Sequence, residues 1–141
     1  MIDIENKVIT EVTNAVHAQY PGITVASDYE EYFATFPAVA IYEVNNELYQ
    51  KSLDGTLNEH HARVTFEVNV YANDQFNRKG TCRDILQIVD ACMLGMRFVR
   101  TYTRRVPNID RSVYRMYARY RAVVEEGKTE GGLTTHQMYR R

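Results

Sequence analysis

Two stretches of the chain place apolar residues on a single stripe at the 3.6-residue period of an α-helix, one in residues 4–16 and one in residues 77–96. The stripes consist of Ile4, Val8, Ile9, Val12, Ala15 and Val16, and of Cys82, Ile85, Leu86, Val89, Cys92, Met93 and Met96. This spacing predicts two amphipathic helices. We expect Asp3 to cap the first, Tyr20-Pro21-Gly22 to end it, and Gly95 to cap the second at its C-terminus.

Two other stretches alternate with a period of two, which is typical of strands with one buried face. In residues 63–71 the predicted inward set is Val64, Phe66, Val68 and Val70, and the outward set is Arg63, Thr65, Glu67 and Asn69. In residues 113–124 one set is Tyr114, Met116, Ala118, Tyr120, Ala122 and Val124, and the other is Arg115, Tyr117, Arg119 and Arg121. Shorter strands are predicted at residues 23–26, 38–44 and 98–105.

The segment between the second and third predicted strands has two interpretations. Asp54-Gly55 is a favoured two-residue turn, so the strands could extend into a long hairpin with arms 38–53 and 56–71. Alternatively, a mobile loop begins at Asn45-Asn46. The conformation of residues 45–62 stays open at this point.

These elements follow one another in the order α-β-β-β-α-β-β, and the 141-residue chain has the length of one domain. Two single-faced helices are buried most economically against one face of one sheet. The sequence therefore predicts an α+β fold with an antiparallel or mixed sheet and both helices on one face. Residues 1–126 form the predicted domain, and residues 127–141 form a polar, extended C-terminal arm.

The net charge of −1 conceals an asymmetry between the two halves of the chain. Residues 1–60 hold ten acids against two lysines, a net of −8, and residues 61–141 hold fifteen cations against eight acids, a net of +7. The basic half could meet nucleic acid, it could meet the acidic half of another copy, or its charges could simply be solvated. The sequence pI of about 6.4 favours the second interpretation, because nucleic-acid-binding domains are usually much more basic.

We expect the two charged halves to supply a subunit interface, and we assign it to nine residues. These are Glu30, Glu31, Glu43, Glu47, Arg104, Arg105, Arg115, Arg119 and Arg121. Arginine suits such an interface, because its planar guanidinium binds two acceptors at once. The tyrosines interleaved with the arginines are most simply explained by sheet packing, although Arg and Tyr are also enriched at subunit contacts and could stack on bases.

No group of residues in the sequence nominates a catalytic, cofactor or metal site. The glycines form no phosphate-binding loop, and the adjacent His60 and His61 would point to opposite faces of a strand. Cys82 and Cys92 lie about three helical turns apart, too far for a disulfide, and are predicted to be buried, inert thiols. No uncharged apolar run approaches the ~20 residues of a membrane-spanning helix. The sequence therefore predicts no enzyme activity, no cofactor and no membrane partner.

Several runs of the chain resemble the minor tail, tail-completion and tail-terminator proteins of tailed bacteriophages. The runs are Met1–Asn6, Tyr20–Ile23, Phe36–Val39, Phe66–Asn73 and Tyr114–Tyr120. The likeness covers about residues 1–125 and rests on pattern and element order. It implies a sheet with two helices in this order and an assembly role without enzyme activity or cofactor.

The resemblance also implies a set of partners. Terminator proteins form six-fold rings that cap the tail tube and dock it to the head connector. For this chain the expected partners are therefore further copies of itself in a hexameric ring, the tail tube protein and the head–tail connector or adaptor protein. Double-stranded DNA would pass through the channel without specific binding. Because strong phosphate contacts would hinder this passage, the resemblance implies that Arg115, Arg119 and Arg121 pair mostly with acids of an adjoining subunit. The expected location is the virion neck, after assembly in the cytoplasm of the host bacterium.

Overall fold

The computed structural model describes residues 3–28, 33, 35–48, 61–107, 111–130 and 133–139, with backbone alone for residues 48, 125–130 and 133–139. The fold is α+β, with the predicted order α-β-β-β-α-β-β followed by one further strand. The helices are α1 (Glu5–Gln19) and α2 (Arg78–Gly95). The strands are β1 (Thr24–Ala26), β2 (Ala38–Leu48), β3 (His61–Ala72), β4 (Val99–Arg105), β5 (Tyr114–Glu130) and β6 (Leu133–Tyr139).

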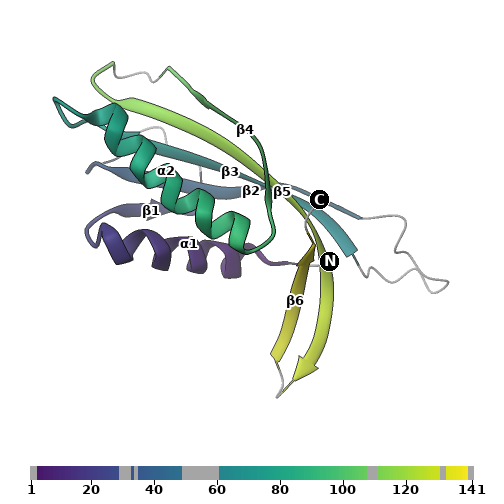
Figure 1. Cartoon of the computed structure of the whole chain (residues 1–141). Coiled ribbons are helices and arrows are strands. Elements are labelled where there is room, and N and C mark those ends of the chain that lie inside the picture. Colours follow the sequence, from purple (N-terminus) through teal and green to yellow (C-terminus); the bar gives the residue numbers. More distant parts are fainter. Residues whose placement is uncertain are drawn as a thin grey trace.

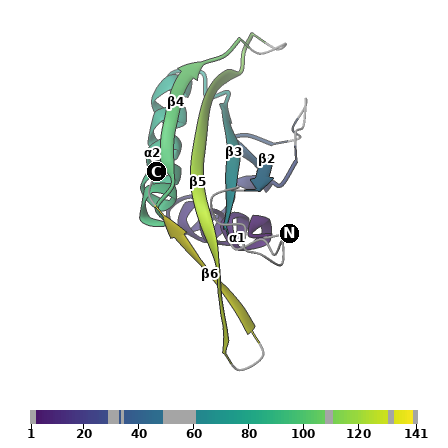
Figure 2. The ribbon, with the colours of Figure 1, turned by 90° about the vertical axis from the view of Figure 1, so that its right-hand side faces the viewer.

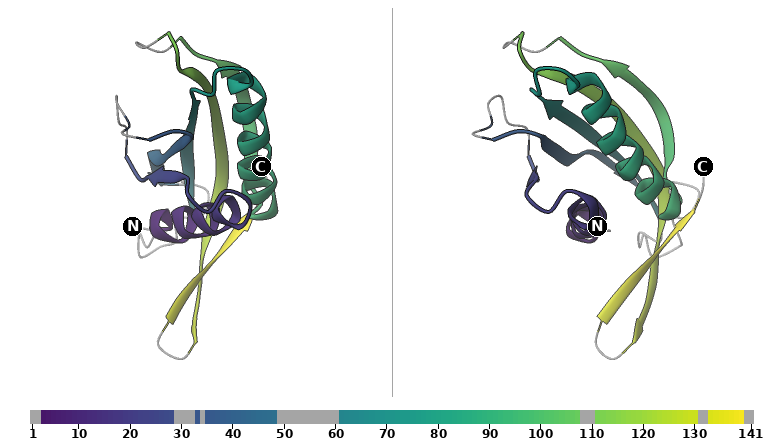
Figure 3. Two further views of the ribbon diagram at one scale, coloured as in Figure 1. Left: turned by 90° about the vertical axis from the view of Figure 1, so that its left-hand side faces the viewer. Right: turned by 60° about the vertical axis from the view of Figure 1, so that its left-hand side comes forward.

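The strands form one mixed sheet in the spatial order β1-β2-β3-β5-β4, and β6 pairs with β5 outside this path (Figure 1). β1 runs parallel to β2, whereas the other pairs are antiparallel. Both helices cover the same face of the sheet (Figures 1 and 3). The predicted architecture is therefore confirmed, and the sheet is the mixed form of the two that were expected.

The main core lies between this sheet and the helices, as the two apolar stripes predict. The helices contribute fully buried side chains on one face each, namely Val8, Val12 and Val16 of α1 and Ile85 and Val89 of α2. The predicted inward residues of β3 and β5 meet them from the sheet, and Phe66 and Tyr120 among them have no exposed surface. Period-two alternation thus identified the buried face of the sheet correctly.

The end of α2 differs from the prediction. Gly95 lies within the last turn of the helix, and the left-handed residue is Arg97, with φ 69°. The N–H of Phe98 bonds to the carbonyl of Met93 at 3.0 Å, and the N–H of Arg97 bonds to that of Leu94 at 2.9 Å. This is the hydrogen-bond pattern of a Schellman cap. Burial of Phe98 and Met93 in the core fixes where the helix ends, so the glycine was a misleading signal.

The start of α1 also differs slightly. Ile4 is the N-cap residue and makes no capping bond through its side chain. Asp3, the predicted cap, lies one residue earlier, and its Oδ1 accepts the N–H of Glu5 at 3.1 Å. Asp3 therefore satisfies one of the free amides at the helix start from a neighbouring position.

The β2–β3 hairpin extends further than the loop interpretation allows. β2 continues to Leu48, and Asn45 and Asn46 pair with Thr65 and Val64 after a β-bulge between Glu43 and Asn45. A loop beginning at Asn45-Asn46 is therefore wrong. The predicted turn at Asp54-Gly55 lies outside the described residues.

The predicted C-terminal arm is paired into strands. β5 continues past Val124 to Glu130, and β6 pairs back along it from Leu133 to Tyr139. This hairpin projects beyond the body of the sheet (Figure 2). The hydrophobic alternation stops near Val124, but backbone pairing does not require burial. Gly131-Gly132 is a dipeptide favoured in hairpin turns, and it was the available sequence signal for this pairing.

Candidate subunit interface

The face of the sheet opposite the helices, here called the open face, carries the outward residues of β3 and β5. The two strands bring Glu67 opposite Arg119, Asn69 opposite Tyr117 and Thr65 opposite Arg121. Directly opposed residues of an antiparallel pair share one face and interact. Neither described helix packs against this face (Figure 3).

A small apolar cluster covers one end of the open face. Ala40 of β2 and Tyr71 of β3 are buried in it, together with Val113, which precedes β5. The ring of Phe33 lies 5.0 Å from that of Tyr71 and 6.3 Å from that of Phe36. The rest of the open face is polar, and its polar side chains determine what can bind there.

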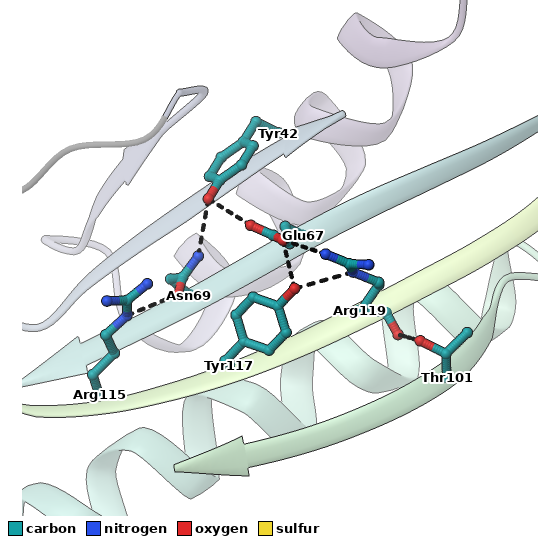
Figure 4. A network of polar contacts seen from close by, with 7 residues as sticks. All are labelled: Tyr42, Glu67, Asn69, Thr101, Arg115, Tyr117 and Arg119. Carbon is teal, nitrogen blue, oxygen red and sulfur yellow. Dashed lines mark hydrogen bonds and ion pairs between the residues drawn. The ribbon is translucent and has the colours of Figure 1, made fainter. Parts of the chain in front are cut away.

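Glu67 is the centre of a polar network on the open face (Figure 4). Its Oε2 accepts a hydrogen bond from the hydroxyl of Tyr42 at 2.7 Å. Its Oε1 accepts one from the hydroxyl of Tyr117 and forms an ion pair with Nη2 of Arg119 at 2.7 Å. Arg119 Nε also donates to the Tyr117 hydroxyl at 3.0 Å. The carboxylate thus links strands β2, β3 and β5.

Asn69 extends this network toward Arg115. Its Nδ2 donates to the Tyr42 hydroxyl at 3.4 Å, and its Oδ1 accepts from Arg115 Nε at 2.9 Å. Asn69 has no exposed surface. Both ends of its amide have partners, as burial of a polar group requires. The Arg115 guanidinium lies 5.6 Å from the ring centre of Tyr71.

The ionisation of the central groups follows from these contacts. Burial opposes ionisation of Glu67, but hydrogen bonds from Tyr117, Arg119 and Tyr42 outweigh it and hold the pKa of the carboxyl below its usual range. Burial and the bonded Glu67 carboxylate raise the pKa of the Tyr42 and Tyr117 hydroxyls. At neutral pH the network therefore contains a carboxylate, two neutral phenols and a guanidinium.

The predicted interface arginines of β5 are thus used largely within their own chain. Arg119 pairs with Glu67 and Arg115 bonds to Asn69, although both were predicted to pair with acids of an adjoining subunit. Arg121 is half-buried, and its Nε has no hydrogen-bond partner among the described residues. An interface role for these three arginines stays a prediction.

The two predicted interface arginines of β4 are different, because they are exposed and make no ion pair with any described residue. Arg104 lies over the ring of Tyr102 at 5.9 Å, and Arg105 lies over the ring of Tyr114 at 5.1 Å. No carboxylate of the described residues forms an ion pair with either guanidinium group. β4 is the last strand at its edge of the sheet.

The predicted interface acids divide into two pairs. Glu30 and Glu31 lie outside the described residues. Glu43 and Glu47 lie on β2, where Glu43 is half-buried and Glu47 is exposed. Glu47 Oε1 accepts from Asn45 Nδ2 at 2.5 Å, and Glu43 Oε1 accepts from Asn46 Nδ2 at 3.5 Å. Neither forms a salt bridge within the described chain.

Glu43 is in an environment that disfavours its charge. Burial, together with nearby Glu5 and Asp3, raises the pKa of its carboxyl. The backbone N–H of Glu43 donates to Glu5 Oε2 at 3.2 Å, which brings the start of α1 against this strand. Carboxylates that gather in this way disfavour one another's charged forms in the isolated subunit.

A second ion pair lies on the helix-bearing side near β4. Arg100 Nη1 is 2.7 Å from Asp90 Oδ1, which also accepts the hydroxyl of Tyr120 at 2.8 Å. Asp90 and Arg100 line a cavity of about 450 Å³ between α2 and β4. Arg100 is thereby neutralised, in contrast to Arg104 and Arg105.

Sequence reasoning missed the central role of Glu67 and Asn69 in the network. Their outward phase on β3 was predicted, and two polar residues in a valine-rich strand were a usable signal. Their partners depend on the register with β2 and β5, which alternation does not determine.

The described residues contain no group of three or more His, Cys, Asp or Glu side chains that could hold a metal ion. Cys82 is buried, and burial raises the pKa of its thiol to about 12, as expected for an unreactive core cysteine. Cys92 is half-buried. Neither described helix is sufficiently long and apolar to cross a bilayer.

Comparison with models of known protein families gives no match for the chain. Comparison with curated protein sequences gives no significant match either.

Proposed function

We propose that the protein is a virion structural component at the neck of a tailed bacteriophage. In this proposal it is a tail terminator or tail-completion protein that caps the tail tube and joins it to the head connector. It acts by assembly, and its partners are further copies of itself, the tube protein and the connector, with DNA passing through the resulting channel.

The observation that carries the proposal is the order of elements around one sheet. The resemblance to tail-completion proteins implies a sheet with two helices in the order α-β-β-β-α-β-β. The chain has that order, with both helices on one face and one further strand at its end. An open sheet face and a projecting β5–β6 hairpin also suit a protein whose surfaces are completed by neighbours (Figure 2).

Disruption of the coding sequence in the producing phage tests this proposal. We expect DNA-filled heads and separate tail tubes in electron micrographs of the lysate, with normal virions restored by a plasmid copy. Gold-labelled antibody against the protein should mark the neck of intact particles. Normal, infectious virions from the disrupted phage would overturn the proposal.

The nearest alternative within this class is another head–tail adaptor ring. The same micrographs distinguish the two, because loss of a terminator leaves tube growth unchecked whereas loss of an adaptor does not. Tubes of uniform, normal length would therefore favour the adaptor.

An alternative from another class is a small nucleic-acid-binding domain that uses the Arg- and Tyr-rich strands β4 and β5. The internal bonds of Arg115 and Arg119 speak against it, because those guanidinium groups are engaged by Asn69 and Glu67. Measuring duplex affinity across a salt series tests it: a steep loss of affinity with salt would support phosphate binding.

A further inference from the structure

The sheet has two edges at which strands are paired on one side only. β4 pairs with β5 and with no other described strand. At the opposite edge β1 covers only Ala38–Ala40 of β2, so Ile41–Leu48 pair with β3 alone among the described residues. Figure 2 shows β4 and β2 toward opposite edges of the sheet. Unpaired edges present backbone donors and acceptors to another strand.

The two edges carry opposite charges. Arg104 and Arg105 lie on β4, which contains no acid, whereas Glu43 and Glu47 lie on β2, which contains no cation. None of these four side chains forms a salt bridge with another described residue. Two like edges would therefore repel each other, and two unlike edges would attract. Such a pattern selects a head-to-tail contact over a symmetric one.

The strand directions permit this contact. β4 and β3 are both antiparallel to β5, and β2 is antiparallel to β3, so β4 and β2 run in opposite directions. A second copy in the same orientation therefore offers its β2 edge to β4 as an antiparallel partner. The helices of both copies then stay on the same face of the continuous sheet.

The charged side chains also match face by face. Arg104 pairs with Tyr117 and Glu47 pairs with Arg63, both outward residues, so Arg104 and Glu47 belong to the open face. Arg105 pairs with Met116 and Glu43 pairs with the core residue Phe66. Arg105 and Glu43 therefore belong to the helix-bearing face.

One register satisfies these faces for the part of β4 from Tyr102 to Arg105. With Arg105 opposite Glu43, the bulge after Glu43 places Arg104 opposite Asn45, and Tyr102 then lies opposite Glu47. Arg104 and Glu47 are diagonal neighbours on the open face in this register. Diagonal positions are about 7–8 Å apart, which long side chains span.

Each edge is also irregular, which limits unspecific pairing. β4 has a bulge between Arg100 and Tyr102, and β2 has one between Glu43 and Asn45. Bulges and charges are features by which edge strands avoid aggregation. A partner edge of opposite charge removes the electrostatic repulsion that otherwise prevents another strand from pairing with this edge.

We propose that β4 of one copy docks on the Ile41–Leu48 edge of β2 in the next copy, so that the sheet continues from subunit to subunit. Arg105 faces Glu43 across the junction, and Arg104 reaches Glu47. A head-to-tail contact closes into a ring or continues as a filament, according to the rotation between neighbouring subunits. The inference deepens the proposed function, and the closure of the subunits into a ring rests on that function.

Reversing one charge on each edge tests the junction. We compare Arg104→Glu, Glu47→Lys and their equimolar mixture with wild type by light scattering after size exclusion. Each variant alone places like charges together, and we expect association to weaken about tenfold. In the mixture, alternating copies bring the introduced glutamate against the introduced lysine at one junction and the two native residues together at the next. Assembly should therefore return.

Lys7→Glu and Asp84→Lys are matched controls, since Lys7 is exposed on α1 and Asp84 is exposed on α2, outside the two edge strands. They should assemble like wild type. Circular dichroism verifies that every variant is folded. Assembly of the single edge variants at wild-type strength, a folded mixture that fails to assemble, or a wild type that remains monomeric at all concentrations would each overturn the inference.

Cross-linking identifies the edges directly. In a Cys92→Ser background, Tyr102→Cys places a thiol on β4 and Asn45→Cys places one on β2, at diagonal positions of the proposed register. A short bismaleimide should link the two variants when they are mixed and should link neither alone. Cross-linking of the Tyr102→Cys variant with itself would indicate a symmetric contact and would contradict the proposed junction.

This test is separate from the test of neck function. If the edges associate but gene disruption leaves virions intact, the proposed function fails and the junction stands. If gold label marks the neck but the charge reversals leave assembly unchanged, the junction fails and the proposed function stands.

Discussion

Glu67 and Arg119 face each other across β3 and β5, with Arg119 Nη2 2.7 Å from Glu67 Oε1. The pair lies on the open face of the sheet, where the carboxylate also receives the hydroxyls of Tyr42 and Tyr117. The Glu67 side chain is only 16% exposed, so its charge depends on these three donors. The Glu67 carboxylate therefore links three strands within one subunit, β5 through Arg119 and Tyr117 and β2 through Tyr42.

Replacing Glu67 with Gln should destabilise the fold by about 2 kcal/mol, because hydrogen bonds to charged groups contribute about 1.5–3 kcal/mol. The substitution removes the negative charge and leaves Arg119 without its partner. Urea unfolding measures the change. Glu11→Gln is the control, since Glu11 is exposed on α1. An equal free energy of unfolding for Glu67→Gln and wild type would contradict the central role of this carboxylate.

The same network predicts how stability responds to acid. The pKa of Glu67 is lower in the folded than in the unfolded protein, so its contribution is complete above the unfolded pKa and is lost as pH falls through the folded one. We expect the stability difference between wild type and Glu67→Gln to shrink as the buffer is taken from neutral to strongly acidic pH. A difference that is independent of pH would mean that the charge is not the stabilising feature.

Glu43 should behave in the opposite way. Burial and the nearby carboxylates of Glu5 and Asp3 raise its pKa, so the charged form destabilises the isolated subunit above the folded pKa. This penalty disappears as pH falls through the folded pKa toward the unfolded one. Glu43→Gln should therefore raise the melting temperature at neutral pH, and the gain should vanish in acid.

A loss of stability on Glu43→Gln at neutral pH would show that the carboxylate has a compensating partner within the chain. Measuring the free energy of unfolding at low protein concentration keeps subunit association from masking the effect.

The sequence predicted the layers of the fold well, because burial imposes a period on each element. The stripes of α1 and α2 and the alternation of β3 and β5 determined which face each element buries, and Val64, Phe66 and Val68 lie in the core as expected. Register left no such trace in the sequence. Glu67 contacts Arg119 only because the register of β3 and β5 places the two residues opposite each other, although they are 52 positions apart in the sequence.

Local signals failed where tertiary packing or backbone pairing decided the outcome. Gly95 suggested a helix end, but burial of Phe98 placed the left-handed conformation at Arg97. The polar residues after Val124 predicted an extended arm without indicating its pairing, and β5 and β6 pair with each other there. The candidate interface arginines were identified by charge, and charge alone did not reveal that Arg115 and Arg119 bond within the chain.

The cap of α2 gives a prediction that separates the two positions at the helix end. Arg97→Gly should stabilise the fold by about 1 kcal/mol, because a left-handed backbone costs roughly 1–2 kcal/mol for an ordinary residue. Gly95→Ala should also stabilise it, by about 0.5–1 kcal/mol, because Gly95 is helical and an added Cβ meets nothing within 4 Å. Thermal unfolding measures both. Destabilisation by Gly95→Ala would indicate that Gly95, and not Arg97, has the left-handed backbone conformation.

Removal of the projecting hairpin should leave the body of the protein folded. Among the residues whose side chains are described, the last buried one on β5 is Val124, and β6 pairs with β5 and with no other described strand. A chain ending at Glu126 should therefore lose no more than about 1 kcal/mol, as is usual for changes outside the core. Equilibrium unfolding in urea measures the loss, with an otherwise identical full-length chain as the control. A much larger loss would show that the β5–β6 hairpin stabilises the body of its own subunit. The suggestion that this hairpin contacts a neighbouring subunit would then lose its support.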